Sequence, residues 1–463
     1  MGVTRKFHNL KTPTPAGAPA LGEFTLRGIV IGVVITVAFT AANVYFGLKA
    51  GITFSTSIPA AVISMAILRG FRGATIQENN IVQTVASAAG TLSSIIFVLP
   101  GLVIVGWWTG FPFWMSFAVC ATGGILGVMY TIPLRRALVT NAPDLPYPEG
   151  VACAEVLKVG SGTGKSADTE SVESGSAGLK AVLWGSIISA AFYIIVQTRI
   201  FASDVVRYFR LGGGADSGAS GFDFSLSFAL FAIGHLVGPA VGIAMLVGAG
   251  IAWGWAIPHF TMLHPAAGPA ADVAQAAWNH YARYIGAGAI GVSAVWTLGT
   301  LVKPVLAGLA GAMAAARVRK AGQAHTLPRI EQDIPIGMVT LVSLVCLVPA
   351  AWLFWHFAQI SGLGSHAWML TVAGVIFVVV IGFLVSTVCG YMAGLIGASN
   401  SPLSGIGILS VVIFALFLVF QVKAAMPAAA GKALVAFALF ATSVVFAVAA
   451  IANNNLQDLK TGQ

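Results

Sequence analysis

The chain has 463 residues, of which 57% are hydrophobic and 8% charged, and its mean hydropathy is +0.90. A soluble domain carries roughly 25% charged residues, so this composition excludes a cytosolic enzyme, a nucleic-acid-binding protein and a disulfide-linked scaffold. The apolar runs are continuous and lack the alternation typical of a transmembrane β-barrel. We therefore expect an all-α fold, a polytopic transmembrane helical bundle.

Long stretches without charged side chains define the predicted spans. Asp, Glu, Lys and Arg are absent from 79–134, 224–271 and 334–422. A spanning helix needs about 20 apolar residues, so each stretch holds several spans, and Pro and Gly clusters mark the turns between them. We predict about twelve spans, including interrupted or re-entrant helices, at 28–48, 52–69, 80–106, 112–134, 180–199, 224–238, 240–258, 284–316, 336–358, 368–396, 403–422 and 432–452.

The hydrophilic segments divide the chain into four predicted parts. These are a polar cytoplasmic N-terminal tail at 1–26, an N-terminal membrane bundle at 27–316 with a hydrophilic loop at 135–179, a basic loop at 317–335, and a C-terminal membrane bundle at 336–463 that we expect to be incomplete.

The basic clusters predict the orientation. With twelve spans, four Lys/Arg clusters lie on the same side as the N-terminus, which the positive-inside bias makes cytoplasmic. The first 22 residues lack the apolar core of a signal peptide. We expect a multi-pass protein of the cell (inner) membrane with a cytoplasmic N-terminus. Segment 200–223 departs from this pattern, because its arginines fall on the opposite side.

Residues 43–59 predict an interrupted helix. An apolar helix changes here into Gly, Ser, Thr and Pro. Broken helices expose backbone polar groups, which membrane depth tolerates only where they line a cavity. We place Tyr45, Lys49, Thr53 and Ser55 on the substrate pathway. Lys49 has two interpretations: it pairs with a substrate carboxylate, or it ends a span and reaches the interface.

Residues 77–90 place polar side chains on a predicted helix. Gln83 with Ser87, and Asn80 with its neighbours, form small polar faces that suit either helix packing or the lining of a substrate pathway. Glu78 lies at the start of this helix. It either complements the positive helix end or serves as a titratable group for proton coupling.

Residues 390–405 contain a second interruption, in the middle of an apolar stretch. Ser399, Asn400 and Ser401 lie either in a tight turn or in an unwound segment that contacts substrate. A weak internal repeat connects this segment to the first, because Tyr45, Gly51, Ser55 and Ser64 match Tyr391, Gly397, Ser401 and Ser410 at a constant offset. Chance and common ancestry both explain four matches, but paired interrupted helices are the best sequence indication of a transporter site.

Two further polar residues lie within predicted spans. Lys303 precedes a proline in an apolar run, where a charge should face water or a partner, unless the run is two segments and Lys303 is interfacial. His235 could relay protons or be a packing residue. The histidines and the four cysteines lack metal-ligand spacing, so we predict no metal, no cofactor and no catalytic residues.

Several ordered motifs resemble the oligopeptide transporter family, above all its prokaryotic branch. They are Ser57-Ile-Pro-Ala-Ala-Val-Ile-Ser64, Glu78-Asn-Asn-Ile-Val-Gln-Thr84, Pro146-Tyr-Pro-Glu-Gly150, Gly397-Ala-Ser-Asn-Ser-Pro-Leu-Ser-Gly405 and Asn455-Leu-Gln-Asp-Leu-Lys-Thr-Gly462. The resemblance implies a secondary transporter that moves short peptides with protons as the coupling partner. A related branch moves metal chelates of phytosiderophore or nicotianamine, which is the alternative substrate class.

The resemblance also raises an expectation about length. Members of the family are typically longer, and the motif that ends at Gly462 lies inside them, so we expect a truncated chain and consider a non-transporting remnant as a further alternative. We predict alternating access around a site lined by the two interrupted segments, with Glu78, Glu149 and His235 as proton-coupling candidates. The expected partners are a small peptide or metal chelate, protons and the lipid bilayer, and no nucleic acid.

Overall fold

The computed structural model describes most of the chain as helix. The described residues are 22–51, 53–140, 142–161, 180, 184–185, 187–196, 198–199, 201–202, 204–214, 217–226, 231, 234–235, 239–293, 295–296, 299–300, 303, 333–399, 401, 403–422 and 430–463. All statements below concern these residues. The basic loop expected at 317–335 lies outside them, apart from its last three positions.

Eight helical segments of the described chain are long and apolar enough to cross a membrane. They are Leu26–Lys49, Ile76–Ile104, Phe113–Thr131, Gly242–Leu263, Ile336–Ile360, Gly364–Ile396, Leu403–Gln421 and Gly431–Gly462. This confirms the predicted class, a polytopic helical membrane protein. The span predicted at 52–69 is instead a helix of 12 residues, Ser57–Leu68, which is too short to span because a helix rises about 1.5 Å per residue.

The first part of the chain forms six helices with two short irregular segments among them. They are α1 (Leu26–Ala50), α2 (Ser57–Leu68), α3 (Ile76–Leu92), the 3-10 segment η1 (Ser93–Phe97), α4 (Pro100–Ile104), α5 (Phe113–Thr131), the π-helical segment η2 (Arg136–Thr140) and α6 (Pro148–Gly160). Threonine hydroxyls cap α1 and α3, since Thr25 and Thr75 accept from backbone N–H groups at 3.0 Å, the usual role of an N-cap.

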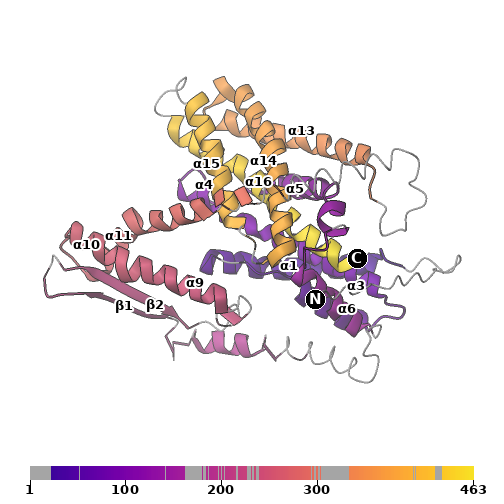
Figure 1. Ribbon diagram of the computed structural model, residues 1–463, viewed down its shortest axis with the longest axis horizontal. Helices are drawn as coiled ribbons and strands as arrows, with labels where there is room; N and C mark the ends of the chain where they lie inside the picture. Colours follow the sequence, from indigo (N-terminus) through magenta and orange to yellow (C-terminus); the bar gives the residue numbers. More distant parts are fainter. Residues whose placement is uncertain are drawn as a thin grey trace, which may run out of the picture.

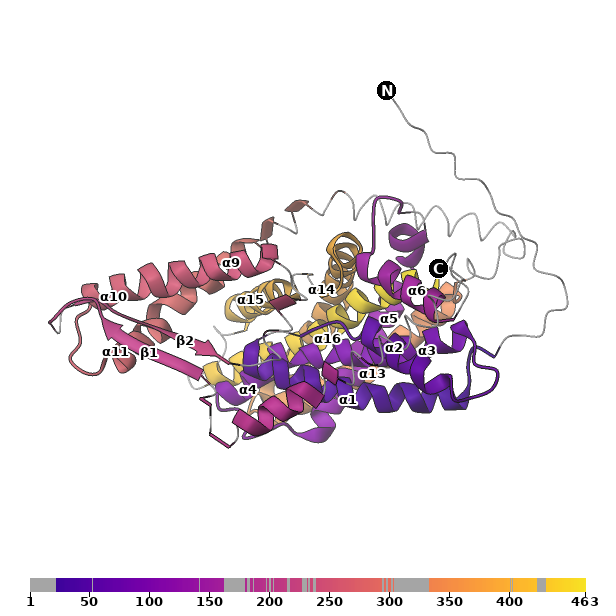
Figure 2. The same cartoon turned by 90° about the horizontal axis from the view of Figure 1, so that it is seen from below.

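A β-hairpin lies where the sequence predicts a loop and the start of a span. Strands β1 (Asp204–Arg210) and β2 (Ala219–Ser225) are antiparallel, and β2 overlaps the span predicted at 224–238, so the predicted start of that span is wrong. The described chain is otherwise mostly helical, as the predicted class requires. The hairpin packs on α10 (Ile257–Leu263) and α11 (Ala270–Ala277), which follow α9 (Pro239–Ala249) and η3 (Gly250–Ala256), with η4 (Trp278–Ala282) last. These elements form one end of the molecule (Figures 1 and 2).

The physical reason for the hairpin is its content of residues that favour strands. Val205, Val206, Tyr208 and Phe209 of β1 are β-branched or aromatic, and apolar and polar side chains alternate along 222–225 of β2, which suits the two faces of a strand. A glycine-rich segment, 212–214, then allows the chain to reverse. The sequence prediction considered only the apolar run that follows and therefore missed this period.

The last part of the chain forms four long helices, one of which is buried among the others. They are α13 (Ile336–Ile360), α14 (Ala367–Ile396) after the short η7 (Gly364–His366), α15 (Leu403–Gln421) and α16 (Gly431–Gly462). Helix α16 is buried along nearly its whole length, and it lies among α5, α14 and α15 in both views (Figures 1 and 2). It ends ten residues beyond its predicted limit at 452, and this extension carries Asn453, Asn454, Gln457 and Asp458.

Close packing on α16 depends on glycines. A side chain at Gly123 or Gly127 of α5 would collide with the backbone of α16, 2.8 Å from the Val444 carbonyl and 2.7 Å from the Val448 carbonyl respectively. Glycines four residues apart let two membrane helices approach closely. The helices of the two predicted bundles are thus in direct contact, because α5 comes from the first and α16 from the second.

Candidate functional site

The first interruption is a sharp break between α1 and α2. Gly51 ends α1 in a left-handed conformation with φ 70°, and residues 53–56 are not helical. The buried side-chain amide of Asn43 replaces backbone hydrogen bonds that the break in the helix removes. Its Nδ2 donates to the carbonyls of Phe54 and Gly90, both at 3.1 Å, and its Oδ1 accepts from the Phe54 N–H at 3.0 Å. Backbone groups that the break exposes are therefore satisfied inside the bundle.

The second interruption lies between α14 and α15. Gly397 ends α14 with φ 90°. Asn453 of α16 donates to the Ala398 carbonyl at 3.0 Å, and the Glu149 carboxylate of α6 accepts from the Ser399 N–H at 3.0 Å. The two interruptions meet, because the Ser55 N–H donates to Ser399 Oγ at 3.2 Å.

A cavity of about 140 Å³ lies between the two interruptions. Its lining consists of Gly51, Thr53, Phe54, Ser55, Thr91, Ser94, Phe97, Ala398, Ser399, Ser401, Leu403, Ser404 and Asn453. Three polar atoms of this lining, Ser94 Oγ, Ser401 Oγ and Asn453 Oδ1, are buried without a hydrogen-bond partner among the described residues. Buried polar groups normally have partners, so the cavity presents free hydrogen-bonding capacity.

The two interruptions match in sequence position. The offset of the weak repeat is 346 residues, from Tyr45 to Tyr391; the same offset carries the end of α1 at 50 and the start of α2 at 57 onto the end of α14 at 396 and the start of α15 at 403. Each interruption also has a glycine with positive φ, at positions 51 and 397. Two matching helix ends and one shared backbone feature strengthen the case for common ancestry.

The two helix groups have opposite directions. Helices α1 and α3 run parallel, because Gly28 lies against Glu78 and Gly47 against Ile96. Helices α14 and α16 also run parallel, because Gly382 lies against Val448 and Gly390 against Leu456. Helices α3 and α16 are antiparallel, since Gln83 contacts Asp458 and Ser87 contacts Asn454. This inverted arrangement is typical of secondary transporters whose substrate site lies between the repeats.

A buried polar cluster lies next to the first interruption. The carboxylate of Asp458 accepts from Gln83 Nε2 at 2.7 Å and from Asn454 Nδ2 at 2.8 Å. Asn454 Nδ2 also donates to Ser87 Oγ at 2.5 Å, and Ser87 Oγ lies 2.7 Å from Ser57 Oγ. The cluster therefore joins α2, α3 and α16 through neutral groups around one carboxylate.

The motif Pro146–Gly150 anchors α6 between the second interruption and α16. Tyr147 adopts φ 46°, its N–H donates to the Gly394 carbonyl at 2.8 Å, and its hydroxyl donates to the Leu138 carbonyl at 2.8 Å. Burial raises the pKa of Tyr147, so the hydroxyl stays a donor. The motif thereby positions Glu149, whose Oε2 is buried without a partner among the described residues.

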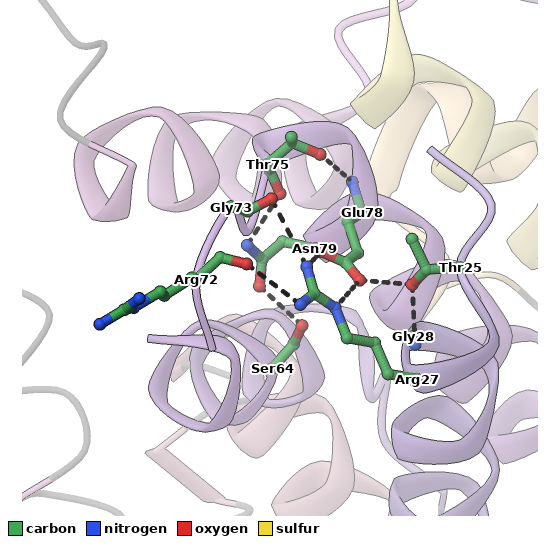
Figure 3. Close-up of polar contacts among 9 residues, drawn as sticks. All are labelled: Thr25, Arg27, Gly28, Ser64, Arg72, Gly73, Thr75, Glu78 and Asn79. Atoms are coloured by element: carbon green, nitrogen blue, oxygen red, sulfur yellow. Dashed lines mark hydrogen bonds and ion pairs between the residues drawn. The ribbon is translucent and has the colours of Figure 1, made fainter. Parts of the chain in front are cut away.

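Glu78 lies in an ion-pair cluster (Figure 3) and is not among the residues that line the cavity. Its carboxylate accepts from Arg27 Nε at 2.6 Å and Nη2 at 2.8 Å, and from the Thr25 hydroxyl. Arg27 also reaches the carbonyls of Arg72 and Gly73. This bidentate geometry connects the starts of α1 and α3 to the turn after α2.

The remaining predicted site residues fall into three groups. Thr53, Ser55, Ser399 and Ser401 line the cavity. Tyr45, Lys49, Lys303 and His235 are exposed side chains outside its lining, and Asn80 and Gln83 face α16 instead, with Asn80 Nδ2 near Gly462. Asn400 lies outside the described residues. The structure thus brings the two interruptions together as a site but not the predicted lysines.

The comparison with known families decides the identity of the chain. Residues 23–463 match the family of the OPT oligopeptide transporter protein. The chain belongs to the OPT family. It is 44% identical over 427 residues to a Haemophilus influenzae protein named as an oligopeptide transporter, covering 90% of this chain and 64% of that relative. No solved structure matches the chain.

More distant relatives of this OPT chain come from Oryza sativa subsp. japonica. One is named an iron-phytosiderophore transporter and is 28% identical over 269 residues, which cover 50% of this chain and 38% of the relative. Another is named a metal-nicotianamine transporter and is 28% identical over 180 residues, covering 29% and 25% of the two chains. Membership in the OPT family confirms the resemblance seen in the motifs.

Sequence reasoning missed the polar residues of α16 in this OPT chain. Asn453, Asn454 and Asp458 were not candidates, although the structure places Asn453 at the cavity and Asp458 in the buried cluster. The available signal was a polar tract, Asn453 to Asp458, that directly continues an apolar run. Such a tract costs free energy unless its members find partners, so it merited the same attention as Gln83.

Proposed function

We propose that this chain forms the substrate site of a secondary transporter that moves short peptides across the cell membrane by alternating access, with protons as the coupling ion and a cytoplasmic N-terminus. The observation that carries the proposal is the meeting of two inverted helix interruptions around a polar cavity. Sites of this kind bind substrate where unwound backbone can contact it. The 44% identical relative named as an oligopeptide transporter supports the substrate class.

The chemistry of the cavity suits the ends of a peptide. Helices α2 and α15 begin at its wall, and helix N-termini favour carboxylates. Asn453 Oδ1 in the lining and the second carboxylate oxygen of Glu149, Oε2, are acceptors without a partner among the described residues that an amino group could use. This assignment gives the carboxylate role to backbone groups, because Lys49 and Lys303 lie away from the cavity lining.

The volume of the cavity indicates a closed state. Ligand pockets usually measure about 300–1,000 Å³, more than the 140 Å³ found here. A tripeptide therefore needs the interruptions to separate, and the bond between Ser55 and Ser399 is the contact that must open. Alternating access supplies that movement when one repeat rocks against the other.

A metal chelate is the second candidate substrate. Two rice relatives, each 28% identical to the chain over the matched residues and named for phytosiderophore or nicotianamine complexes, support this alternative. Because the chain spans 64% of the length of its bacterial relative, transport by this chain alone is part of the proposal, and a non-transporting remnant is the competing outcome.

Uptake of labelled tri- to pentapeptides into proteoliposomes with an inward proton gradient tests the proposal. We expect gradient-dependent accumulation, and a raised KM in Ser401→Ala, because loss of one hydrogen bond of about 0.5–1.5 kcal/mol weakens binding by roughly two- to twelvefold. Ser365→Ala, an exposed site, is the matched control. Stimulation only by an iron chelate supports the second candidate, and no flux of either substrate supports the remnant.

A further inference from the structure

Asp458 is a buried carboxylate that the proposed function has not yet used. It is 3% exposed, and no ion pair among the described residues includes it. The groups that donate to it, the amides of Gln83 and Asn454 and the hydroxyl of Ser57, are neutral. An ionised carboxylate in such a place is costly without a balancing positive charge, so an ion or a proton is needed to neutralise it.

The charged and titratable groups around Asp458 do not supply that balance. From α6, the carboxylate of Glu149 and the thiol of Cys153 face it, and neither is a cation. Helix α2 carries no titratable side chain, and α14 carries only Cys389 and Tyr391.

Three other elements pack near this end of α16. Glu78 of α3 is held by Arg27, and Cys120 and Tyr130 are the titratable residues of α5, neither of which is a cation. Arg136 of η2 pairs with Asp333 at 2.8 Å. On α16 itself, Lys460 donates to Gln463 at 3.1 Å. The cations of the neighbourhood therefore have partners other than Asp458.

A row of hydroxyls connects the cavity to Asp458. Ser55 lines the cavity, its Oγ lies 3.2 Å from Ser57 Oγ, and Ser57 Oγ lies 3.5 Å from Asp458 Oδ1. A hydroxyl both donates and accepts a hydrogen bond, so this row can pass a proton inward. Ser57 is also the first residue of α2, directly after the interruption that meets Ser399.

Protonation would change the bonds of this cluster. A proton that arrives from Ser57 on Asp458 Oδ1 makes that oxygen a donor, which opposes the Nε2 donor of Gln83 at 2.7 Å. The buried Oε1 of Gln83, which has no partner among the described residues, becomes the better acceptor once the amide turns. Because Oδ1 is also the acceptor of the Ser57 hydroxyl, its protonation weakens the bond that holds the start of α2.

We propose that Asp458 takes up the coupling proton, which reaches it from the cavity through the hydroxyls of Ser55 and Ser57. This inference rests on the proposed function and deepens it, since it names the residue that connects proton uptake to the first helix interruption. Protonation neutralises the buried carboxylate and frees α2 to move away from Ser399.

Two transport measurements on the full chain in proteoliposomes test the proposal with trialanine. With one proton per peptide, an inward gradient of one pH unit supports about tenfold accumulation, because one unit corresponds to about 1.4 kcal/mol. We expect this accumulation in the wild type and its loss in Asp458→Asn, while exchange of labelled for unlabelled trialanine without a gradient persists. Glu155→Gln, an exposed acid of α6, is the matched control and should accumulate normally.

Three results would overturn the assignment. In the first, Asp458→Asn accumulates trialanine as the wild type does. In the second, Glu78→Gln loses gradient-driven accumulation while Asp458→Asn keeps it. In the third, a sodium gradient drives accumulation and a pH gradient does not. Ser57→Ala keeps the carboxylate and removes the hydroxyl row, so it should slow gradient-driven uptake even if Asp458→Asn does not fold. Uptake at the wild-type rate in that variant contradicts the route.

Infrared titration separates this proposal from the proposed function. The wild type should show a C=O band of a protonated carboxyl that titrates with pH and is missing in Asp458→Asn. If the wild type neither exchanges nor accumulates trialanine, peptide transport by this chain is wrong, and the infrared band alone decides whether Asp458 binds a proton. Absence of the band in the wild type refutes the role of Asp458.

Discussion

The role of a buried acid in this protein depends on its hydrogen-bond and ion-pair partners and not on its charge alone. Glu78 and Asp458 are both buried acids, yet Glu78 has a guanidinium partner and Asp458 has only neutral donors. A bidentate ion pair favours the permanently ionised state, whereas a carboxylate among amides can change its protonation during a transport cycle. Burial next to a cation therefore favours a structural role for Glu78, and burial without one supports the role proposed for Asp458.

Cys153 offers a test of burial at the same scale. It is fully buried on α6, and burial, together with the negative charge of Asp458, raises its pKa to about 12. The thiol is protonated below this value, so at pH 7–9 the reactive thiolate is almost absent. A variant retaining only Cys153 should react with N-ethylmaleimide at a rate close to background in folded protein, and fully after denaturation in detergent. Labelling of the folded protein that climbs between pH 7 and 9 would contradict this burial.

At the scale of elements, the two helix interruptions resemble each other but differ in how tightly they are packed. A side chain at Gly51 would meet no atom within 4 Å, whereas one at Gly397 would lie 2.7 Å from Glu149 Oε1. Both glycines have positive φ. Asn43 forms hydrogen bonds to the backbone of the first interruption, and Glu149 and Asn453 do so at the second. The two equivalent glycines therefore differ in how much space a side chain would have.

This difference predicts unequal effects of alanine. Gly51→Ala should lower the free energy of unfolding by about 1–2 kcal/mol, the cost of a left-handed non-glycine residue. Gly397→Ala adds a collision with Glu149 and should lower it further. Thermal unfolding of the purified variants in detergent measures both. Equal shifts in melting temperature would mean that Glu149 moves away without cost.

For the whole molecule, the buried helix α16 organises the bundle. Helices from both ends of the chain surround it: α3, α5 and α6 come from the first part of the sequence and α14 and α15 from the last. Its Ala-rich surface and the facing glycines allow short distances between helices. A helix that contacts both repeats can transmit a change at Asp458 to each of them.

Packing against α16 can be tested with two adjacent glycines. A Cβ at Gly123 would lie 2.8 Å from the Val444 carbonyl and collide with Ala447, whereas the nearest atom to a Cβ at Gly124 is Leu92 Cδ2 at 3.8 Å. Gly123→Ala should therefore destabilise the protein by about 1–3 kcal/mol, the usual cost of overpacking. Gly124→Ala is the control and should leave the melting temperature nearly unchanged. Equal melting temperatures for the two variants would show that α5 shifts freely on α16.

Sequence reasoning located both interruptions and four residues of the cavity, because an apolar helix that changes to Gly, Ser and Pro is visible locally. Lys49 and Lys303 lie outside the lining of this cavity, because the direction of a side chain depends on the helix face that neighbours cover, and their roles on the substrate pathway stay predictions. Sequence reasoning also missed the hairpin at 204–225 and the polar extension of α16, where the spans on either side dominated the interpretation.

The amino-acid sequence alone established the membrane class, the apolar helices and the family, since these depend on composition and on ordered local motifs. The comparison with relatives adds that this chain of 463 residues spans 64% of the length of its bacterial relative. Contacts between distant positions required the fold: Ser57 and Asp458 are separated by 401 positions, and Ser55 and Ser399 by 344. No local pattern encodes such pairs, because they arise only when antiparallel helices pack and buried polar groups must find partners.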